Sequence, residues 1–313
     1  MGQVVVSRRT DPAGNLALEE ALLAVPRTDT WLYLWRNGPV VVIGRNQNPY
    51  LECSLDYLEE QGIPVVRRLS GGGAVYHDLG NLNYTFLCPE SQMDVRRQTG
   101  LIQRAVQDLG VSCTFSGRND LLCAGRKISG QAYYTGNGGA YHHGTLLVDV
   151  DLERMARALT PSGLKLETKS VPSVRRRVVN LRELNPEITV EAVAKALARR
   201  FQEEYGPAAV QEWDFEASPP PNLARYRSAQ WNLGSCPAYG ASMDVSTSAG
   251  IFQVRAKVVH GRITEAALST DALEQVPVPL LEQALLDCPF LASEVAGRLE
   301  EALRPGGIPK EQE

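Results

Sequence analysis

The 313-residue sequence lacks closely spaced cysteines. A zinc site or a dense disulfide framework needs clustered cysteines, and no CxxC pair is present. Wide scattering is typical of reduced thiols in a cytosolic protein, so we expect a cytoplasmic protein. The six cysteines are Cys53, Cys88, Cys113, Cys123, Cys236 and Cys288.

Long apolar runs and a strong charge bias are also missing. No stretch approaches the ~20 apolar residues of a membrane span, and the N-terminal apolar run is too short for a signal peptide. The net charge of -4 gives no reason to expect binding to nucleic acid or to a membrane. We therefore expect an intracellular protein with no nucleic-acid or membrane partner, and a monomer by default.

Two familiar phosphate-binding motifs are absent, but a glycine run is present. Neither GxxxxGK[ST] nor the spaced glycines of a dinucleotide-binding loop occurs, whereas residues 67–78 read RRLSGGGAVYHD. Such a run can be a mobile surface turn. It can also be backbone that passes close to an anion, with Arg67 and Arg68 supplying paired charge to a triphosphate. Composition alone leaves these two interpretations about equal.

The periodicity along the chain predicts a mixture of helices and strands. Residues 31–45 read as two strands joined by a hairpin at Asn37-Gly38, and residues 48–62 have helical spacing. Strands are predicted after residue 62, over 81–89 and over 120–150. Helices are predicted over 93–110, 151–159 and 190–206. The order does not repeat as βαβ, so we expect an α+β fold.

A proline-rich segment predicts a domain boundary. Residues 215–222 read FEASPPPN, and three consecutive prolines favour a stiff, extended connector. We expect a large domain over residues 1–216, a linker over 217–222 and a small α+β domain over 223–313.

Several motifs, in this order, resemble the lipoate–protein ligase A family. RRLSGGGAVYHDLGN (residues 67–81) is similar to its RRxSGGGxVxHDxGN signature. GRKISGQA (125–132) is similar to its KxSG lysine segment, and HHGTLL (142–147) to its HHGTLL strand. IGRNQNP (43–49) matches as well, so the resemblance covers most of residues 30–155. The chain after residue 220 resembles the family's accessory domain in size and position.

The resemblance implies a fold and a two-step reaction. The large mixed-sheet domain should be like the catalytic domain of the biotin and lipoate ligases, with a small α+β C-terminal accessory domain. The carboxylate of lipoate would attack ATP, with Mg²⁺, to give lipoyl-AMP and pyrophosphate. A lysine of a lipoyl domain would then take the lipoyl group and release AMP. The implied acceptors are lipoyl domains of 2-oxoacid dehydrogenase E2 subunits and the glycine-cleavage H protein.

The same resemblance implies roles for individual residues. Lys127 would be the catalytic lysine, and it would contact both nucleotide and lipoate. The other implied nucleotide-binding residues are Arg68, Gly73, Ala74, Val75, Tyr76 and Asn119. The other implied lipoate-binding residues are Ser70, Gly71, Gly72, His77 and His143.

Ordinary structural roles remain open for some of these residues. Tyr76 and His77 can equally be packing residues of the core. Asp120 is implied as a metal ligand, although an aspartate that caps a strand is equally plausible. His142 and His143 are adjacent on a predicted strand, so one should point inward and the other outward, and we do not expect the pair to bind a metal.

Three other functions compete with an ATP-dependent ligase. One is an ATP-independent octanoyl or lipoyl transferase that takes the acyl group from a carrier protein, with Cys123 as a nucleophile near Lys127. Another is a transferase that uses preformed lipoyl nucleotide. Leu69 favours the latter, because many relatives have a third arginine at this position. The last is a non-catalytic lipoate sensor, which has no need for the cations Lys127 and Arg68.

Overall fold

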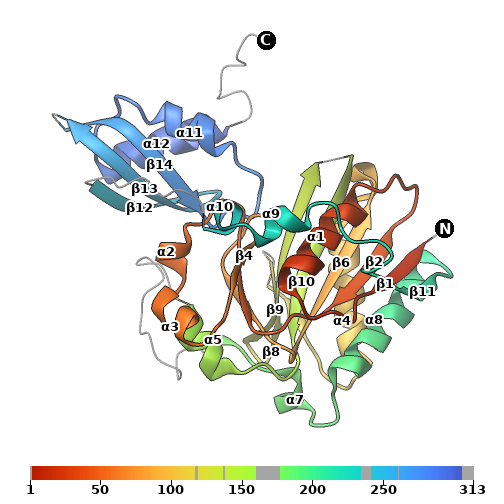
Figure 1. Cartoon of the computed structure of the whole chain (residues 1–313). Helices are drawn as coiled ribbons and strands as arrows, with labels where there is room; N and C mark the ends of the chain where they lie inside the picture. The colour runs from red at the N-terminus through yellow and green to blue at the C-terminus, as the bar shows by residue number, and fades with distance from the viewer. Residues whose placement is uncertain are drawn as a thin grey trace.

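The computed structural model describes residues 2–116, 119–136, 138–159, 177–233, 241–259 and 261–304 of the chain. Two bodies are visible, a large one that contains the N-terminus and a smaller one near the C-terminus (Figure 1). No helix within the described ranges combines the length and the apolar character needed to cross a membrane.

An eight-stranded mixed sheet is the centre of the large domain. Its spatial order is β11-β1-β2-β6-β10-β9-β8-β7. β1 pairs in parallel with β11 and β2, and the other neighbours are antiparallel. The strands are β1 (Gln3–Val6), β2 (Trp31–Trp35), β6 (Asn81–Cys88), β7 (Thr114–Phe115), β8 (Asp120–Cys123), β9 (Arg126–Gly136), β10 (Gly139–Leu147) and β11 (Ala209–Glu212).

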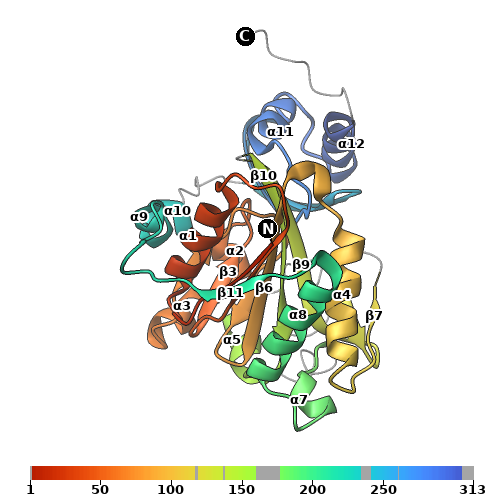
Figure 2. The same cartoon turned by 90° about the vertical axis from the view of Figure 1, so that its right-hand side faces the viewer.

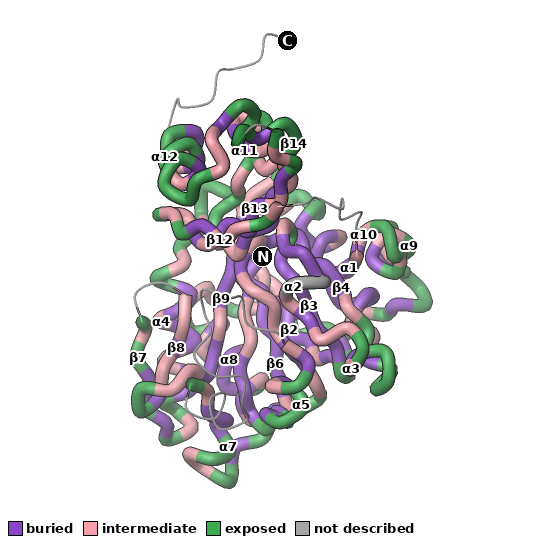
Figure 3. Tube along the Cα trace, turned by 90° about the vertical axis from the view of Figure 1, so that its left-hand side faces the viewer, coloured by how far each residue is buried: buried purple, intermediate pink, exposed green. Residues whose placement is uncertain are grey.

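Helices cover both faces of this sheet (Figure 2). α4 (Val95–Gln107) and α8 (Val190–Tyr205) pack against each other on one face, and α1 (Pro12–Leu23) lies on the other. In α4 the apolar residues recur at helical spacing, so Leu101 and Ala105, one turn apart, are both fully buried. The central strands are buried from both sides, and exposed residues gather on the outer helices and loops (Figure 3).

A second sheet of three short strands packs beside the first. Its order is β4-β3-β5, with β3 (Val40–Ile43), β4 (Val65–Arg67) and β5 (Val75–His77). β2 and β3 therefore belong to different sheets, and the predicted hairpin at Asn37-Gly38 is wrong. The Asn37 side chain is fully buried instead of forming an exposed turn, and the Gly38 N–H donates to a carbonyl outside the segment.

Short helices connect the longer elements of the large domain, and one of them, α5 (Leu152–Ala158), contacts both β5 of the second sheet and α3 (Leu55–Glu60). The predicted helix over residues 48–62 is two helices interrupted at Cys53, whose backbone forms a bridge with Leu159. The short helices are α2 (Pro49–Glu52), α3 (Leu55–Glu60), η1 (Glu90–Gln92), α5 (Leu152–Ala158) and α7 (Leu181–Leu184).

The C-terminal domain has its own sheet and its own core. β12 (Ala241–Thr247), β13 (Gly250–Val259) and β14 (Arg262–Thr270) are antiparallel, and α11 (Val278–Ala284) and α12 (Ala292–Leu303) pack on them. Their buried apolar residues form a separate cluster. A large mixed sheet with helices plus a small α+β domain confirms the predicted fold class.

The segment between the two domains packs on the large one. α9 (Leu223–Arg227) lies against α1, and α10 (Ala229–Asn232) lies against β4. Tyr226 of α9 is buried in the same apolar cluster as residues of α1 and β2. The boundary at 217–222 stays a prediction, and α9 and α10 belong by packing to the large domain.

Candidate active site

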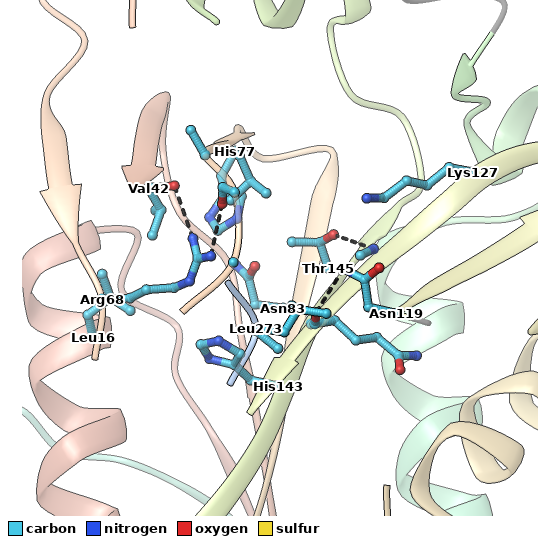
Figure 4. Close-up of a pocket in the computed structure, with 18 of the residues that line it drawn as sticks. Leu16, Val42, Arg68, His77, Asn83, Asn119, Lys127, His143, Thr145 and Leu273 are labelled. Carbon is cyan, nitrogen blue, oxygen red and sulfur yellow. Dashed lines mark hydrogen bonds between the residues drawn. The ribbon is translucent and has the colours of Figure 1, made fainter. Parts of the chain in front are cut away.

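A cavity of about 110 Å³ lies between the glycine loop and the interior strands β6, β10 and β9 of the large sheet. Residues far apart in the sequence meet there, and Arg68 and Lys127 extend from opposite sides (Figure 4). Nine of the predicted site residues line it: Arg68, Gly72, Gly73, Ala74, Val75, His77, Asn119, Lys127 and His143.

Each of the three glycines in the loop has a different reason to be glycine. A Cβ on Gly71 would lie 2.1 Å from the carbonyl oxygen of Ala272, which belongs to the C-terminal domain. Gly72 has φ +87°, a conformation that other residues rarely adopt. Its N–H donates to the same Ala272 oxygen at 2.6 Å. Only Gly73 faces open space in the cavity.

The Arg68 side chain holds the glycine loop in place through hydrogen bonds. Its guanidinium donates to the carbonyl oxygens of Val42, Gly71 and Gly73 and to the hydroxyl of Ser70, at 2.6 to 3.2 Å. Burial lowers the pKa of Arg68 to about 10, which leaves it a cation at neutral pH. The side chain therefore shapes the loop and brings one positive charge to the cavity wall.

A buried chain of hydrogen bonds runs from Arg68 to Glu19 of α1. Glu19 Oε1 lies 2.8 Å from His143 Nδ1, and His143 Nε2 lies 2.7 Å from Ser70 Oγ. The Glu19 carboxylate accepts the Nδ1–H of His143, and the Ser70 oxygen accepts from Arg68 Nε. Thr85 donates to the same Glu19 oxygen at 2.6 Å. The negative charge thus lies near the buried guanidinium without touching it.

A β-bulge directs the Lys127 side chain into the cavity from the wall opposite Arg68. The pairing of β8 with β9 shifts between Leu121 and Leu122, and Lys127 pairs with Leu122 whereas Gly130 pairs with Asp120. The Lys127 ammonium lies 2.8 Å from the carboxylate of Asp120, and both side chains are about one-third exposed. Bulges characteristically redirect a side chain in this way.

Gly130 leaves room for that lysine. A Cβ at position 130 would lie 2.8 Å from Lys127 Nζ and 3.0 Å from its Cε. Gly144 of the HHG segment is tight in the same region, because a Cβ there would lie 2.3 Å from the Tyr84 hydroxyl and 2.7 Å from the Gly130 oxygen. The glycines of KISG and HHG therefore mark close approaches around the lysine.

Four predicted site residues lie beside the cavity without lining it. Ser70 and Gly71 belong to the loop but do not line the cavity, and both accept hydrogen bonds from Arg68. Tyr76 is 1% exposed and packs in the core beneath β3. Asp120 reaches the site through its ion pair with Lys127.

Adjacent residues on a strand separate as alternation requires. His143 lines the cavity, whereas His142 packs on the far side of the sheet, 3.0 Å from Gln98 Oε1.

Arg67 likewise points away from Arg68. Its guanidinium binds five backbone carbonyls and ties α10 to β4, so the predicted pair of phosphate-facing arginines is split. The carbonyls belong to Gly44, Arg45, Gln47, Trp231 and Asn232.

Some site residues carried no signal in the sequence. Asn83 lines the cavity on β6, and its Nδ2 has no hydrogen-bond partner among the described residues. Leu273 reaches the cavity from the C-terminal domain. Glu19 is a buried carboxylate in the PAGNLALEEALL segment, whose residues are nearly all buried, and an acidic residue within this mostly apolar helix is the one feature that could have revealed it.

Two residues that favoured a transferase lie away from the cavity. Cys123 is 2% exposed in the core under α4, and its pKa is raised by the neighbouring Cys113 thiol and by burial. A thiol in that environment is a poor nucleophile. Leu69 is 4% exposed and packs in the cluster with α1, so a side chain at this position faces the core.

The described residues of the cavity could hold a metal ion only together with phosphate oxygens of a nucleotide. No group of three or more His, Cys, Asp or Glu side chains that could hold a metal ion occurs within the described ranges. Mg²⁺ in nucleotide sites is commonly held by one or two carboxylates and by phosphate oxygens. Asp120, ion-paired with Lys127 at the cavity, fits such a partial site.

Two family models match the chain. The model of the lipoyl protein ligase A/B catalytic domain matches residues 11–202, which is more than half of the chain. The model of the bacterial lipoate protein ligase C-terminus matches residues 236–310.

Solved structures are similar to most or nearly all of this chain. LipL1 of P. falciparum, in complex with lipoate, has a TM-score of 0.78 and 26% identity, and covers 95% of this chain and 94% of its own. A bi-partite lipoate protein ligase of Thermoplasma acidophilum, studied with its E2 lipoyl domain, has a TM-score of 0.66 and 27% identity. The match covers 77% of this chain and 99% of that protein's chain. A lipoate-protein ligase A bound with ATP has a TM-score of 0.63 and 27% identity, and the match covers 74% of this chain and 98% of that protein's chain.

Proposed function

The chain belongs to the lipoyl protein ligase A/B family, and from that premise we propose that it is an ATP-dependent lipoate–protein ligase. The observation that carries the proposal is the cavity itself. It places the cations Arg68 and Lys127 on opposite walls and lines the space between them largely with apolar groups and glycine backbone. A fatty-acid-like carboxylate and a nucleotide phosphate need these two kinds of surface.

In the first step, a carboxylate oxygen of lipoate attacks the α-phosphorus of ATP. The P–O bond to pyrophosphate breaks, and lipoyl-AMP and pyrophosphate form. Two anions must approach each other, so a cation between them lowers the barrier. Lys127 is suited to this role because its ammonium can turn from Asp120 to the carboxyl and phosphate oxygens. Mg²⁺, held by Asp120 and phosphate oxygens, would supply further charge neutralisation.

In the second step, the uncharged ε-amine of an acceptor lysine attacks the acyl carbon of lipoyl-AMP. An amide forms, the bond between the acyl carbon and the phosphate oxygen breaks, and AMP leaves while the amine nitrogen releases one proton to solvent. We propose lipoyl domains of 2-oxoacid dehydrogenase E2 subunits and the H protein as acceptors. The T. acidophilum relative, which was studied with an E2 lipoyl domain, supports this class of partner.

The test is pyrophosphate release from ATP and lipoate in the absence of any acceptor, for the wild type and for Lys127→Ala. We expect lipoate-dependent release that falls at least about a hundredfold in the variant. Lys257→Ala is the matched control, since Lys257 is also paired with a carboxylate, Glu265, but lies in the C-terminal domain. No release by the wild type, with transfer from synthetic lipoyl-AMP intact, would identify a transferase instead.

A further inference from the structure

A chain of buried asparagines leads from α1 to the cavity. Asn15 of α1 and Asn37, which follows β2, are both fully buried. The Asn15 amide nitrogen lies 3.0 Å from the Arg9 carbonyl oxygen and 2.9 Å from that of Arg36. Because carbonyls only accept, the nitrogen end of Asn15 must face them. The Ser7 hydroxyl donates to Asn15 Oδ1 at 2.7 Å, which agrees with this orientation.

The orientation of Asn15 determines that of Asn37. Asn15 Nδ2 also lies 2.9 Å from Asn37 Oδ1, so its two hydrogens are shared among three acceptors. If the Asn37 amide were turned over, its NH₂ group would face the NH₂ group of Asn15, so the atom next to Asn15 is the oxygen. The other end of the Asn37 amide, its NH₂ group, therefore faces His77, with Nδ2 3.2 Å from His77 Nδ1. An amide nitrogen only donates, so His77 Nδ1 must be the unprotonated nitrogen of the ring.

The surroundings of His77 disfavour a second proton. The ring is 3% exposed, and its pKa is lowered to about 3 by burial, by the Arg68 cation and by His143. The ring of Trp35 meets it edge-on, with centroids 6.3 Å apart. A neutral ring with an unprotonated Nδ1 carries its single proton on Nε2. Nε2 is buried with no hydrogen-bond partner among the described residues, and His77 lines the cavity.

We propose that Asn37, oriented by Asn15, is a positioning residue that holds His77 as the neutral Nε2–H tautomer, ready to donate a hydrogen bond to a carboxyl oxygen of the acyl substrate. The tautomer follows from the asparagine chain alone, whereas the identity of the acceptor rests on the proposed function. His77 then has no free basic nitrogen in the cavity. It binds the substrate oxygen and cannot serve as the base for the attacking amine.

The tautomer can be measured without any ligand. The sequence contains only four histidines, so protein labelled with ¹⁵N in histidine alone gives eight ring-nitrogen signals. His77→Gln identifies the pair that belongs to His77. We expect Nε2 to have the chemical shift of a protonated ring nitrogen and Nδ1 that of an unprotonated one, unchanged from pH 6 to pH 8.5. A protonated Nδ1 in the wild type overturns the proposal.

Asn37→Asp should move the proton of His77 from Nε2 to Nδ1, and it changes the shape of the side chain very little. The new carboxylate still accepts from Asn15, but it now needs a donor from His77, so Nδ1 becomes protonated. Above the raised pKa of His77, Nε2 then presents a lone pair to the cavity, and below that pKa it regains its proton. We expect lipoate, titrated calorimetrically at pH 8.5, to bind at least about tenfold more weakly than to the wild type. The loss should shrink towards pH 6.

Asn222→Asp is the control for an added negative charge. Asn222 precedes α9, and its side chain makes no capping hydrogen bond, so this variant should bind lipoate as the wild type does at every pH. A merely structural role for Asn37 would give a loss that does not depend on pH, and that result overturns the donor role of His77. Failure of the wild type to bind lipoate would contradict the proposed function instead, and the histidine spectrum would still decide the tautomer.

Discussion

The two walls of the cavity are built differently. On the glycine-loop wall, Arg68 and His77 are at most 5% exposed, and His143 of β10, which is hydrogen-bonded to Ser70 of the loop, is 7% exposed. Each of the three is held by hydrogen bonds to other buried groups. On the opposite wall, Lys127 is one-third exposed, and its one ion pair within the described part of the chain is with Asp120. The first wall is held in place by these hydrogen bonds, although His77 Nε2 has no hydrogen-bond partner among the described residues. The other can change partners.

This difference suits a reaction in which charge moves. A preorganised wall supplies binding and a fixed field at no cost of rearrangement during the reaction. A lysine on a flexible stem can follow a carboxylate as it becomes an adenylate and then an amide. Substitutions on the two walls should therefore have opposite signatures: loss of stability on the first, and loss of rate with an intact fold on the second.

Arg68→Met should give the largest loss of stability. It removes the donors for the carbonyls of Val42, Gly71 and Gly73 and leaves Glu19 without a nearby cation. We expect the free energy of unfolding in urea to fall by about 3–5 kcal/mol. Lys127→Met should change it by less than about 1 kcal/mol, because that ion pair is partly exposed. Equal losses for the two variants would contradict the distinction between the walls.

Glu19→Gln should have a smaller effect on the same wall. The amide has nearly the shape of the carboxylate but no charge, and its oxygen still accepts from Thr85 and His143. We expect unfolding in urea to become easier by about 1–3 kcal/mol. Glu265→Gln, in an exposed pair with Lys257, should stay within about 0.5 kcal/mol of the wild type. A comparable loss in both variants would mean that the buried chain adds nothing.

How far these walls could be predicted from the sequence differs between them. The motifs led to Lys127, Asn119 and His143, and strand alternation predicted that only one of the two adjacent histidines faces the cavity. Asn37 could not be interpreted correctly, because Asn-Gly is a local hairpin signal and its burial depends on Asn15 in another element. Tertiary contacts override local turn preference in such a case.

The glycine run shows the same limit more sharply. The sequence left open a mobile turn or a backbone that passes close to an anion, and the approach to an anion stays a prediction. What the structure contains beside Gly71 and Gly72 is the Ala272 carbonyl of the C-terminal domain. A contact between segments so distant in the chain leaves no periodicity or spacing in a single sequence.

Gly130→Ala tests whether the second wall acts through the position of Lys127. The new Cβ would lie 2.8 Å from Nζ, so the flexible side chain must move while the backbone need not. We expect adenylate formation, measured in a single turnover, to slow by about tenfold or more with little change in stability. Gly100→Ala in α4, with its nearest neighbour at 3.5 Å, is the control. Combining Gly130→Ala with Lys127→Ala should slow the reaction no further than Lys127→Ala alone.

Asp120→Asn should give the smallest change in stability and the clearest test of what holds the lysine. The pair is about one-third exposed, so we expect less than about 1 kcal/mol in urea unfolding. Since the carboxylate is also the proposed partner of Mg²⁺, the concentration of Mg²⁺ needed for half-maximal ATP binding should rise several-fold in calorimetric titrations. An unchanged requirement for Mg²⁺ would reduce Asp120 to a partner of Lys127 alone. The wall that carries Lys127 would then contribute only the charge of that lysine, without a bound Mg²⁺.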